Sequence, residues 1–135
     1  MREQLKKSTI VKLLNTIIRI GLGLMLLVFG LNKFFWFMPD FEFGDNIGAA
    51  NLFQAFTDSE YMWPLVGGLE AIVGILFILK KAFPAAVLAL IPISVNIVLF
   101  HAVLDLPNIG PALAVAILNG YFIYKNWGHY RHLMQ

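Results

Sequence analysis

Apolar residues run almost without interruption through four stretches of the chain. The first stretch is Leu13–Leu31, and three more lie between residues 61 and 124, separated only by Lys80–Lys81 and by Asp105–Asn108. A helix needs about 20 such residues to cross the hydrocarbon of a bilayer. A chain of 135 residues cannot hide four all-round apolar helices in a water-soluble core. The pattern therefore predicts an all-α fold, a polytopic membrane four-helix bundle that has the bilayer as its solvent.

The predicted elements follow from these stretches, and we expect them to form a single transmembrane domain over residues 1–135. The helices should cover residues 9–35, 62–79, 82–104 and 109–124, with an outer loop at residues 36–61. Because the connections between the last three helices are short, these helices should run antiparallel to one another. Within the loop, Leu52, Phe53 and Phe56 recur at helical spacing. This spacing predicts a short interfacial helix over Ala49–Phe56.

Lysine and arginine gather on one side of the predicted bundle, and Lys33 alone falls on the other side. The residues on the first side are Arg2, Lys6, Lys7, Lys12, Lys80, Lys81, Lys125 and Arg131. Cytoplasmic loops of membrane proteins carry the excess of these two residue types. We therefore expect a multi-pass protein of the bacterial inner (cytoplasmic) membrane, with both termini cytoplasmic and the long acidic loop facing outward.

The composition agrees with this class and excludes several kinds of chemistry. Hydrophobic residues make up 59% of the chain and charged residues only 13%. There is no cysteine, so the chain supplies no disulfide, no thiol exchange and no thiolate metal site. One histidine, His101, lies near the outer face and the other two lie in the C-terminal tail, so no pair can clamp a haem. We predict no metal site, no nucleic-acid partner and no cofactor carried by the chain itself.

Two charges, Arg19 and Glu70, lie within predicted membrane spans. A charge near the middle of a bilayer costs at least about 2.5–3.5 kcal/mol on insertion scales, so each should face the bundle interior and have a partner. One reading is structural: an ion pair between the two, or a neutral Glu70 that is hydrogen-bonded to an amide. The other reading makes Glu70 a ligand anchor or a proton-handling carboxylate in a cavity.

Asparagines on two further helices add to this set. Asn96 lies at nearly the depth of Glu70, and Asn119 completes a group of four polar residues from four helices. We expect Arg19, Glu70, Asn96 and Asn119 to point inward in the outer half of the bundle, with Glu70 within hydrogen-bond reach of at least one of the others. His101 should share a helix face with Ser94 and Asp105.

Three segments together resemble the DoxX family of small four-helix membrane proteins. Arg19–Phe34 resembles its opening helix, Pro64–Leu79 with Gly-Gly-Leu-Glu resembles its second helix, and Pro92–Leu106 resembles its third. The resemblance implies a link to sulfur and thiosulfate oxidation with quinone as acceptor, or to redox-stress membrane assemblies. It marks, as ligand-binding candidates, Arg19, Asn32, Lys33, Glu70, Asn96 and His101. Because the chain lacks cysteine, a thiol-relay role would need thiols from a partner.

Three classes of function fit these observations. The first is a redox-linked component that binds quinone or another small lipophilic ligand in an outer-half cavity lined by the residues above and by Asn119. Such a chain would be at most an accessory component of a quinone-linked oxidoreductase. The second is a non-catalytic membrane subunit or scaffold that docks a membrane or periplasmic redox partner. The third is a small transporter or channel, which would need a homo-oligomer because four short helices leave little room for alternating access.

Overall fold

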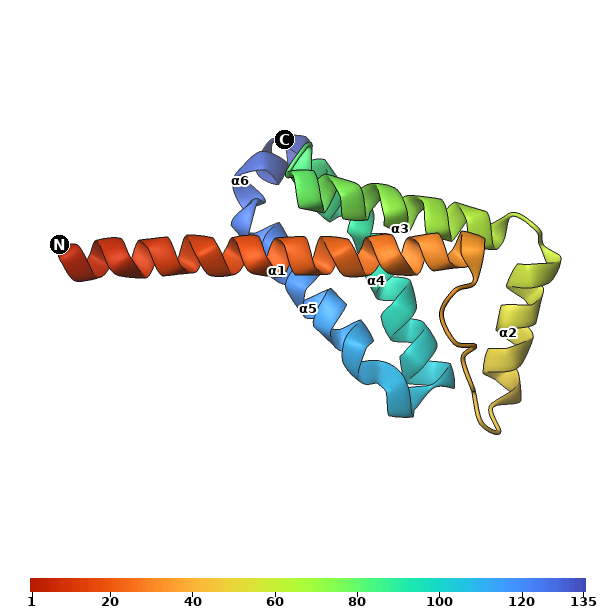
Figure 1. The fold of residues 1–135 in the computed structure, drawn as a ribbon. Helices are drawn as coiled ribbons and strands as arrows, with labels where there is room; N and C mark the ends of the chain where they lie inside the picture. The colour runs from red at the N-terminus through yellow and green to blue at the C-terminus, as the bar shows by residue number, and fades with distance from the viewer.

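The computed structural model describes all 135 residues, and it contains helices and turns but no β-strand. Figure 1 shows four long helices, a short helix that lies across one end of them, and a short C-terminal helix. In chain order the elements are α1 (Arg2–Phe35), α2 (Ile47–Asp58), α3 (Met62–Leu79), α4 (Phe83–Leu104), a 3-10 turn (Leu106–Asn108), α5 (Ile109–Lys125), α6 (Trp127–Tyr130) and a final 3-10 turn (Arg131–Met134).

The four long helices are each long and apolar enough to cross a membrane. In the most apolar part of each helix only 22–28% of the residues are buried inside the fold, so most of these side chains are at least partly exposed. Exposed leucine and isoleucine in such numbers require a lipid environment rather than water. The predicted fold class is therefore confirmed: the chain is a multi-pass, all-α membrane protein.

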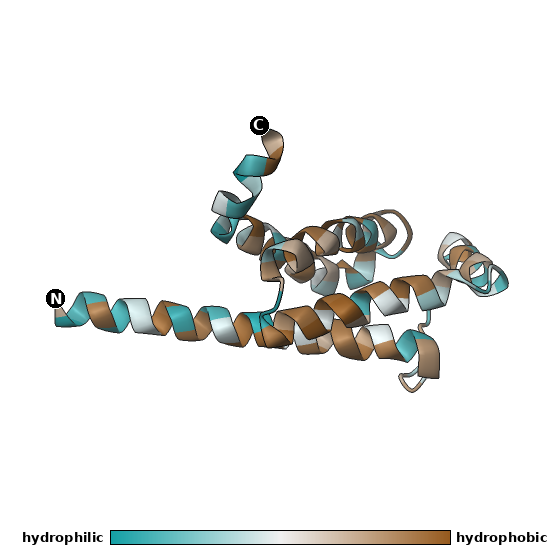
Figure 2. Cartoon of the chain, turned by 90° about the horizontal axis from the view of Figure 1, so that it is seen from above, coloured by the Kyte–Doolittle hydropathy of each residue, from teal (hydrophilic) through white to brown (hydrophobic).

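Helix α1 begins at Arg2. The hydropathy alone predicts a start at Thr9. The added turns contain good helix formers and no glycine or proline, and Glu3 lies in the first turn, where its charge stabilises the helix dipole. Every residue from Met1 to Leu14 is exposed, and this segment projects beyond the other helices (Figure 1). Figure 2 shows that hydrophilic residues gather on this projection and near the C-terminus, while hydrophobic residues dominate the packed helices.

The long helices are organised as two pairs. Helix α1 packs along most of the length of α3, and α4 packs along α5, with each pair antiparallel (Figure 1). The contact between α3 and α4 joins the pairs. One end of the bundle, the Lys80 end, holds the turn between α3 and α4 and the C-terminal α6. The other end, the α2 end, holds α2 and the connection between α4 and α5.

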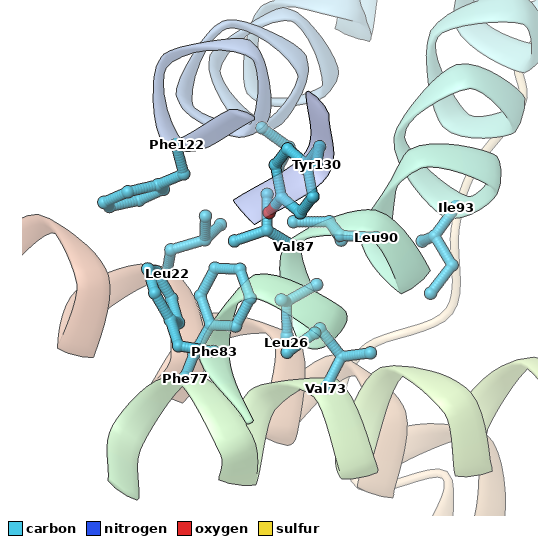
Figure 3. Close-up of a cluster of buried hydrophobic side chains, with 12 residues drawn as sticks. Leu22, Leu26, Val73, Phe77, Phe83, Val87, Leu90, Ile93, Phe122 and Tyr130 are labelled. Carbon is cyan, nitrogen blue, oxygen red and sulfur yellow. The ribbon is translucent and has the colours of Figure 1, made fainter. Parts of the chain in front are cut away.

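A cluster of buried apolar side chains joins both pairs near the Lys80 end. Figure 3 shows Leu22, Phe77 and Phe83 turned toward one another where α1, α3 and α4 meet. The ring centroids of Phe77 and Phe83 are 4.9 Å apart, and Phe122 of α5 lies 5.3 Å from Phe83. Because lipid is as apolar as these side chains, close packing rather than exclusion from water stabilises this cluster.

Helix α2 occupies the segment in which the sequence predicts a short helix, and it extends the predicted range at both ends. Its N-cap, Asn46, accepts a hydrogen bond from the Ala49 backbone N–H at 3.1 Å. Phe53 packs between Phe43 and Trp63, with ring centroids 4.7 Å apart in each case. Aromatic packing therefore fastens α2 to the start of α3, and the position of α2 at a membrane surface stays a prediction.

Candidate functional site

Two glycine pairs let α1 and α3 approach until their backbones touch. A methyl group added at Gly30 would lie 2.7 Å from the Gly67 carbonyl oxygen, and one added at Gly74 would lie 2.6 Å from the Gly23 carbonyl oxygen. The two glycines of each helix are seven residues apart, which is close to two helical turns. The α1–α3 seam, defined by Gly23, Gly30, Gly67 and Gly74, therefore fixes the register of the two helices.

This register brings Lys33 of α1 to Glu70 of α3. The Lys33 Nζ lies 2.6 Å from the Glu70 Oε2, and the two side chains are 16% and 7% exposed. Each residue lies three positions beyond a paired glycine, so their backbones are offset by about 9 Å along the seam. Helical side chains lean toward the N-terminus of their own helix, and in an antiparallel pair this lean carries the two charged groups toward each other.

The Lys33–Glu70 pair keeps unused hydrogen-bonding capacity. The Lys33 ammonium group has three N–H donors, of which one reaches Glu70 and one reaches the Phe29 carbonyl oxygen at 3.3 Å. The second carboxylate oxygen of Glu70 accepts no hydrogen bond, and it is not among the fully buried atoms. The pair therefore has one N–H donor and one carboxylate oxygen without a hydrogen-bond partner.

Arg19 binds backbone and not Glu70. Its guanidinium group donates to the carbonyl oxygens of Phe77 and Ile78, the latter at 3.0 Å. These carbonyls belong to the last turn of α3, where the helix has no N–H groups left to satisfy them. A cation at a helix C-terminus also stabilises the negative end of the helix dipole. Arg19 therefore caps α3. The prediction that Glu70 lies within hydrogen-bond reach of Arg19, Asn96 or Asn119 is wrong, because its hydrogen-bond partner is Lys33.

Asn32 is buried and also serves the backbone. Its side-chain oxygen accepts a hydrogen bond from the Met38 N–H at 2.8 Å, and its carbonyl oxygen accepts one from the Trp36 N–H at the end of α1. Trp36 adopts a left-handed conformation there, with φ 50°. Asn32 thus stabilises the sharp turn in which the chain leaves α1.

Asn119 forms a separate polar contact between α4 and α5. Its side-chain amide lies 2.9 Å from the Ser94 hydroxyl oxygen, and both residues are buried. In the amide orientation that satisfies both of its polar atoms, the nitrogen donates to the Val87 carbonyl oxygen at 3.0 Å and the oxygen accepts from the Ser94 hydroxyl. Asn119 points inward as predicted, but Ser94, whose role the sequence analysis did not identify, is its partner.

Asn96 and His101 lie apart from both contacts. Asn96 is exposed on the outside of α4 and makes no hydrogen bond, so the prediction that it points inward is wrong. Ser94 occupies the buried face instead, two positions earlier. His101 lies 3.0 Å from Asp105 through its Nδ1, which confirms that these two share a helix face. Asp105 in turn accepts a hydrogen bond from the Asn108 side chain at 2.9 Å.

The seven candidate residues therefore do not form one site. Lys33 and Glu70 form a pair, and Asn32 precedes Lys33 in α1. Arg19 lies at the Lys80 end. Asn96 and His101 lie on α4, and Asn119 lies on α5, where it contacts α4. The sequence could have indicated the Lys33–Glu70 pair, because Gly30 and Gly67 precede the two residues by three positions each. One hollow lies between the loop at residues 43–46 and residues 103–107, where it touches Asp105, the partner of His101.

Comparison with known proteins places the chain in a family. The model of the DoxX family matches residues 14–102, which is more than half of the chain and covers most of α1, all of α2 and α3, and most of α4. The matched range includes Arg19, the α1–α3 seam and the Lys33–Glu70 pair. No curated protein and no solved structure matches the chain. With this match and four membrane-spanning helices in hand, we conclude that the chain belongs to the DoxX family.

Proposed function

We propose that this chain binds a quinone, or another small lipophilic molecule with carbonyl or hydroxyl groups, beside the Lys33–Glu70 pair. One observation carries the proposal: the pair has a free N–H donor on Lys33 and a free oxygen acceptor on Glu70. A quinone carbonyl oxygen would accept from Lys33. The hydroxyl of the reduced form would donate to Glu70. A ligand that changes between these two forms could use both members of the pair.

The surroundings of the pair suit a flat apolar ring that arrives from the lipid. Gly68 leaves the part of α3 beside the seam without a bulky side chain, and the Phe34 ring lies 4.0 Å from the position of a methyl group there. Lys33 and Glu70 retain some exposure, so the pair can be reached. Mostly apolar walls with a few polar groups that fix orientation are typical of small-molecule sites.

In this proposal the chain is an accessory component of a redox assembly in the bacterial inner membrane, with both termini in the cytoplasm. A quinone supplies two-electron redox chemistry when bound, and the protein's own residues bind and orient it. Electrons would come from a membrane or periplasmic redox partner or from a diffusible reductant. The placement of the N-terminus, the Lys80–Lys81 turn and the C-terminus at one end of the bundle supports this orientation.

Titration with a short-chain benzoquinone that carries one isoprenoid unit tests the proposal. The purified chain would be held in lipid nanodiscs, and quenching of tryptophan fluorescence would report binding. Trp63 is a suitable reporter because it is buried on α3 two turns from Glu70. We expect saturable binding that Lys33→Met weakens about ten- to hundredfold, since a hydrogen bond from a charged donor is lost. Glu70→Gln should weaken binding of the reduced quinol more than binding of the quinone.

Lys12→Met is the matched control, because Lys12 lies on the same helix and is exposed. This variant should bind quinone as the wild type does. Where Lys33→Met alone fails to fold, the double variant Lys33→Met with Glu70→Leu removes both charges and restores an apolar pair. Equal quinone affinity in the wild type and in the folded Lys33 variant would refute the proposal.

A second candidate function, a non-catalytic docking subunit, is favoured by the acidic surface at the α2 end. Five exposed carboxylates gather on α2 and the loops that flank it, and none of them forms a salt bridge: Asp40, Glu42, Asp45, Asp58 and Glu60. Such a surface suits a basic partner protein. A photo-crosslinking residue at Glu42 should then capture a partner in native membranes, with its yield falling at high salt, while one at Ile72 on the lipid face of α3 should not.

A further inference from the structure

Asn96 presents an amide to the lipid with no partner within the chain. It lies inside α4, about 12 Å from the end of that helix at Leu104. The amide makes no hydrogen bond to any side chain or to the turn of helix before it. In hydrocarbon no water is present to satisfy such a group, so an unpaired amide at this depth is strongly disfavoured. A polar group outside this chain would satisfy the amide.

The face of α4 around Asn96 is suited to close helix packing. Residues three, four and seven positions apart lie along one line of the helix surface. All residues on this face are exposed and none is charged: Ala85, Ala89, Pro92, Asn96, Leu99 and Val103. The two alanines and Pro92 have small side chains, and they occupy the half of the face toward the Lys80 end. The backbone of a neighbouring helix could therefore approach closely there. We name these six residues the α4 outer face.

We propose that two copies of the chain associate through the α4 outer face, with the Asn96 side chains of the two copies hydrogen-bonded to each other. A side-chain amide has both N–H donors and a carbonyl acceptor, so Asn96 is complementary to a second Asn96. The face carries no charge, so two copies meet without electrostatic repulsion. The α4 outer face is thus complementary to itself in its polar group and in its lack of charge.

Membrane insertion supplies the geometry that this pairing needs. All copies of one sequence insert in the same orientation, so a two-fold axis along the membrane normal relates two neighbours. This symmetry places each residue at the same depth as its copy. Asn96 then meets Asn96, and Ala89 meets Ala89. A different protein would have to present a polar group at that particular depth, whereas a second copy does so by symmetry.

Association of labelled copies in lipid vesicles tests the role of Asn96. Energy transfer between donor- and acceptor-labelled chains, measured over a series of protein-to-lipid ratios, gives the dimer affinity. We expect Asn96→Leu to weaken the dimer by about three- to thirtyfold, in line with measured hydrogen bonds between membrane helices. Asn96→Gln keeps the amide and should retain most of the affinity. Because Asn96 is exposed and hydrogen-bonds to no other residue of the chain, neither variant should lower the melting temperature of the monomer.

The absence of cysteine makes a disulfide test clean. A disulfide requires Cα atoms within about 4.4–6.8 Å of each other. The proposed interface brings the two Ala89 residues together, so oxidation of an Ala89→Cys variant in membranes should give a cross-linked dimer. Ile72→Cys is the matched control, since Ile72 is 59% exposed on the outside of α3. It should give no dimer.

Four results would overturn the proposal: a wild-type chain that stays monomeric at every ratio, a dimer that Asn96→Leu leaves unchanged, cross-linking at Ile72 but not at Ala89, or cross-linking of Ala89→Cys only to a different protein. None of these variants alters Lys33 or Glu70. The proposed ligand site and this interface can therefore fail independently of each other.

Discussion

The α1–α3 pair and the α4–α5 pair use different means to hold two helices together in a membrane. In the first pair, glycines remove side chains from the contact, and the backbones touch at Gly23–Gly74 and Gly30–Gly67. In the second pair, side chains fill the contact, and Asn119 reaches Ser94 across it. Gly110 and Gly120 of α5 face open space and take no part in packing. Glycine is thus informative only where it is paired.

The two helix pairs also differ in the polar groups that they leave without a hydrogen-bond partner. Close backbone contact in α1–α3 moves the long polar side chains to the ends of the seam, where Arg19 caps α3 and Lys33 reaches Glu70. The charged pair there retains capacity for a ligand. The α4–α5 pair satisfies its buried amide internally and leaves Asn96 on the outside. This difference underlies our two proposals, a small molecule at the first pair and another helix at the second.

Enlarging a seam glycine should give the largest effect. In Gly30→Leu the new side chain would meet the Ala71 nitrogen and the Gly67 carbonyl oxygen within 2.7 Å of its first carbon. These are backbone atoms that cannot move aside, so we expect a loss of at least about 3 kcal/mol in the free energy of unfolding, or no folded protein. Thermal unfolding in detergent, followed by tryptophan fluorescence, measures it.

Gly21→Leu is the control for that variant, because Gly21 lies on the same helix and a methyl group there meets nothing within 4 Å. It should be neutral or slightly stabilising, since leucine favours the helix more than glycine does. Equal damage from both variants would mean that the glycines act through helix propensity and not through contact between α1 and α3.

Removal of the Arg19 cap should come next in size. Arg19→Met keeps most of the side-chain volume but leaves the Phe77 and Ile78 carbonyl oxygens without a donor. Unsatisfied buried acceptors cost about 1–3 kcal/mol, and hydrogen exchange should rise in the last turn of α3. Arg19→Lys retains a cation and should lose less. If Lys12→Met, at an exposed position of the same helix, proved equally destabilising, the capping role would be disproved.

The sequence predicts the fold well because the signals for it are local and long. Apolar stretches of about 20 residues specify each span, and short connections specify antiparallel neighbours for α3, α4 and α5. The partners of the polar residues depend on helix rotation and register instead. Asn96 and Ser94 lie two positions apart, and hydropathy alone does not decide which of them faces inward. Lys33 has the right spacing from Gly30 to pair with Glu70, but it lies beyond the apolar stretch Leu13–Leu31, whereas Arg19 lies within it.

Substitution of Asn119 should lower the free energy of unfolding by less than the loss of the Arg19 cap, and Asn96 provides the contrasting case on α4. Asn119→Ala removes the contact with Ser94 and should lower the free energy of unfolding by about 0.6–1.7 kcal/mol. Asn96→Ala should leave the stability of the monomer unchanged, because Asn96 has no partner in the chain. A double-mutant cycle with Ser94→Ala measures the coupling at Asn119. A coupling near zero would show that Asn119 acts through packing alone.

The smallest effect should come from Tyr130, which fastens the C-terminal α6 to the start of α4. Its hydroxyl group donates to the Pro84 carbonyl oxygen at 2.7 Å, and the residue is 6% exposed. Tyr130→Phe removes this bond, and we expect a loss of about 0.5–1.5 kcal/mol in the free energy of unfolding. Tyr124→Phe is the control, because Tyr124 is 76% exposed and should tolerate the change.

The stability lost in Tyr130→Phe should depend on pH, and this dependence tests the buried contact of the Tyr130 hydroxyl group further. Burial raises the pKa of Tyr130 above its ordinary value, so the ionised side chain is less favourable in the folded chain than in the unfolded one. The stabilisation from Tyr130 is therefore complete below about pH 10, where a tyrosine of the unfolded chain titrates, and is lost as the pH rises through the higher folded pKa. Melting curves from about pH 9 to about pH 11 should show the advantage of the wild type over Tyr130→Phe shrinking steadily. An advantage that stays constant over this range would mean that the hydroxyl group of Tyr130 is not held in a buried contact with α4.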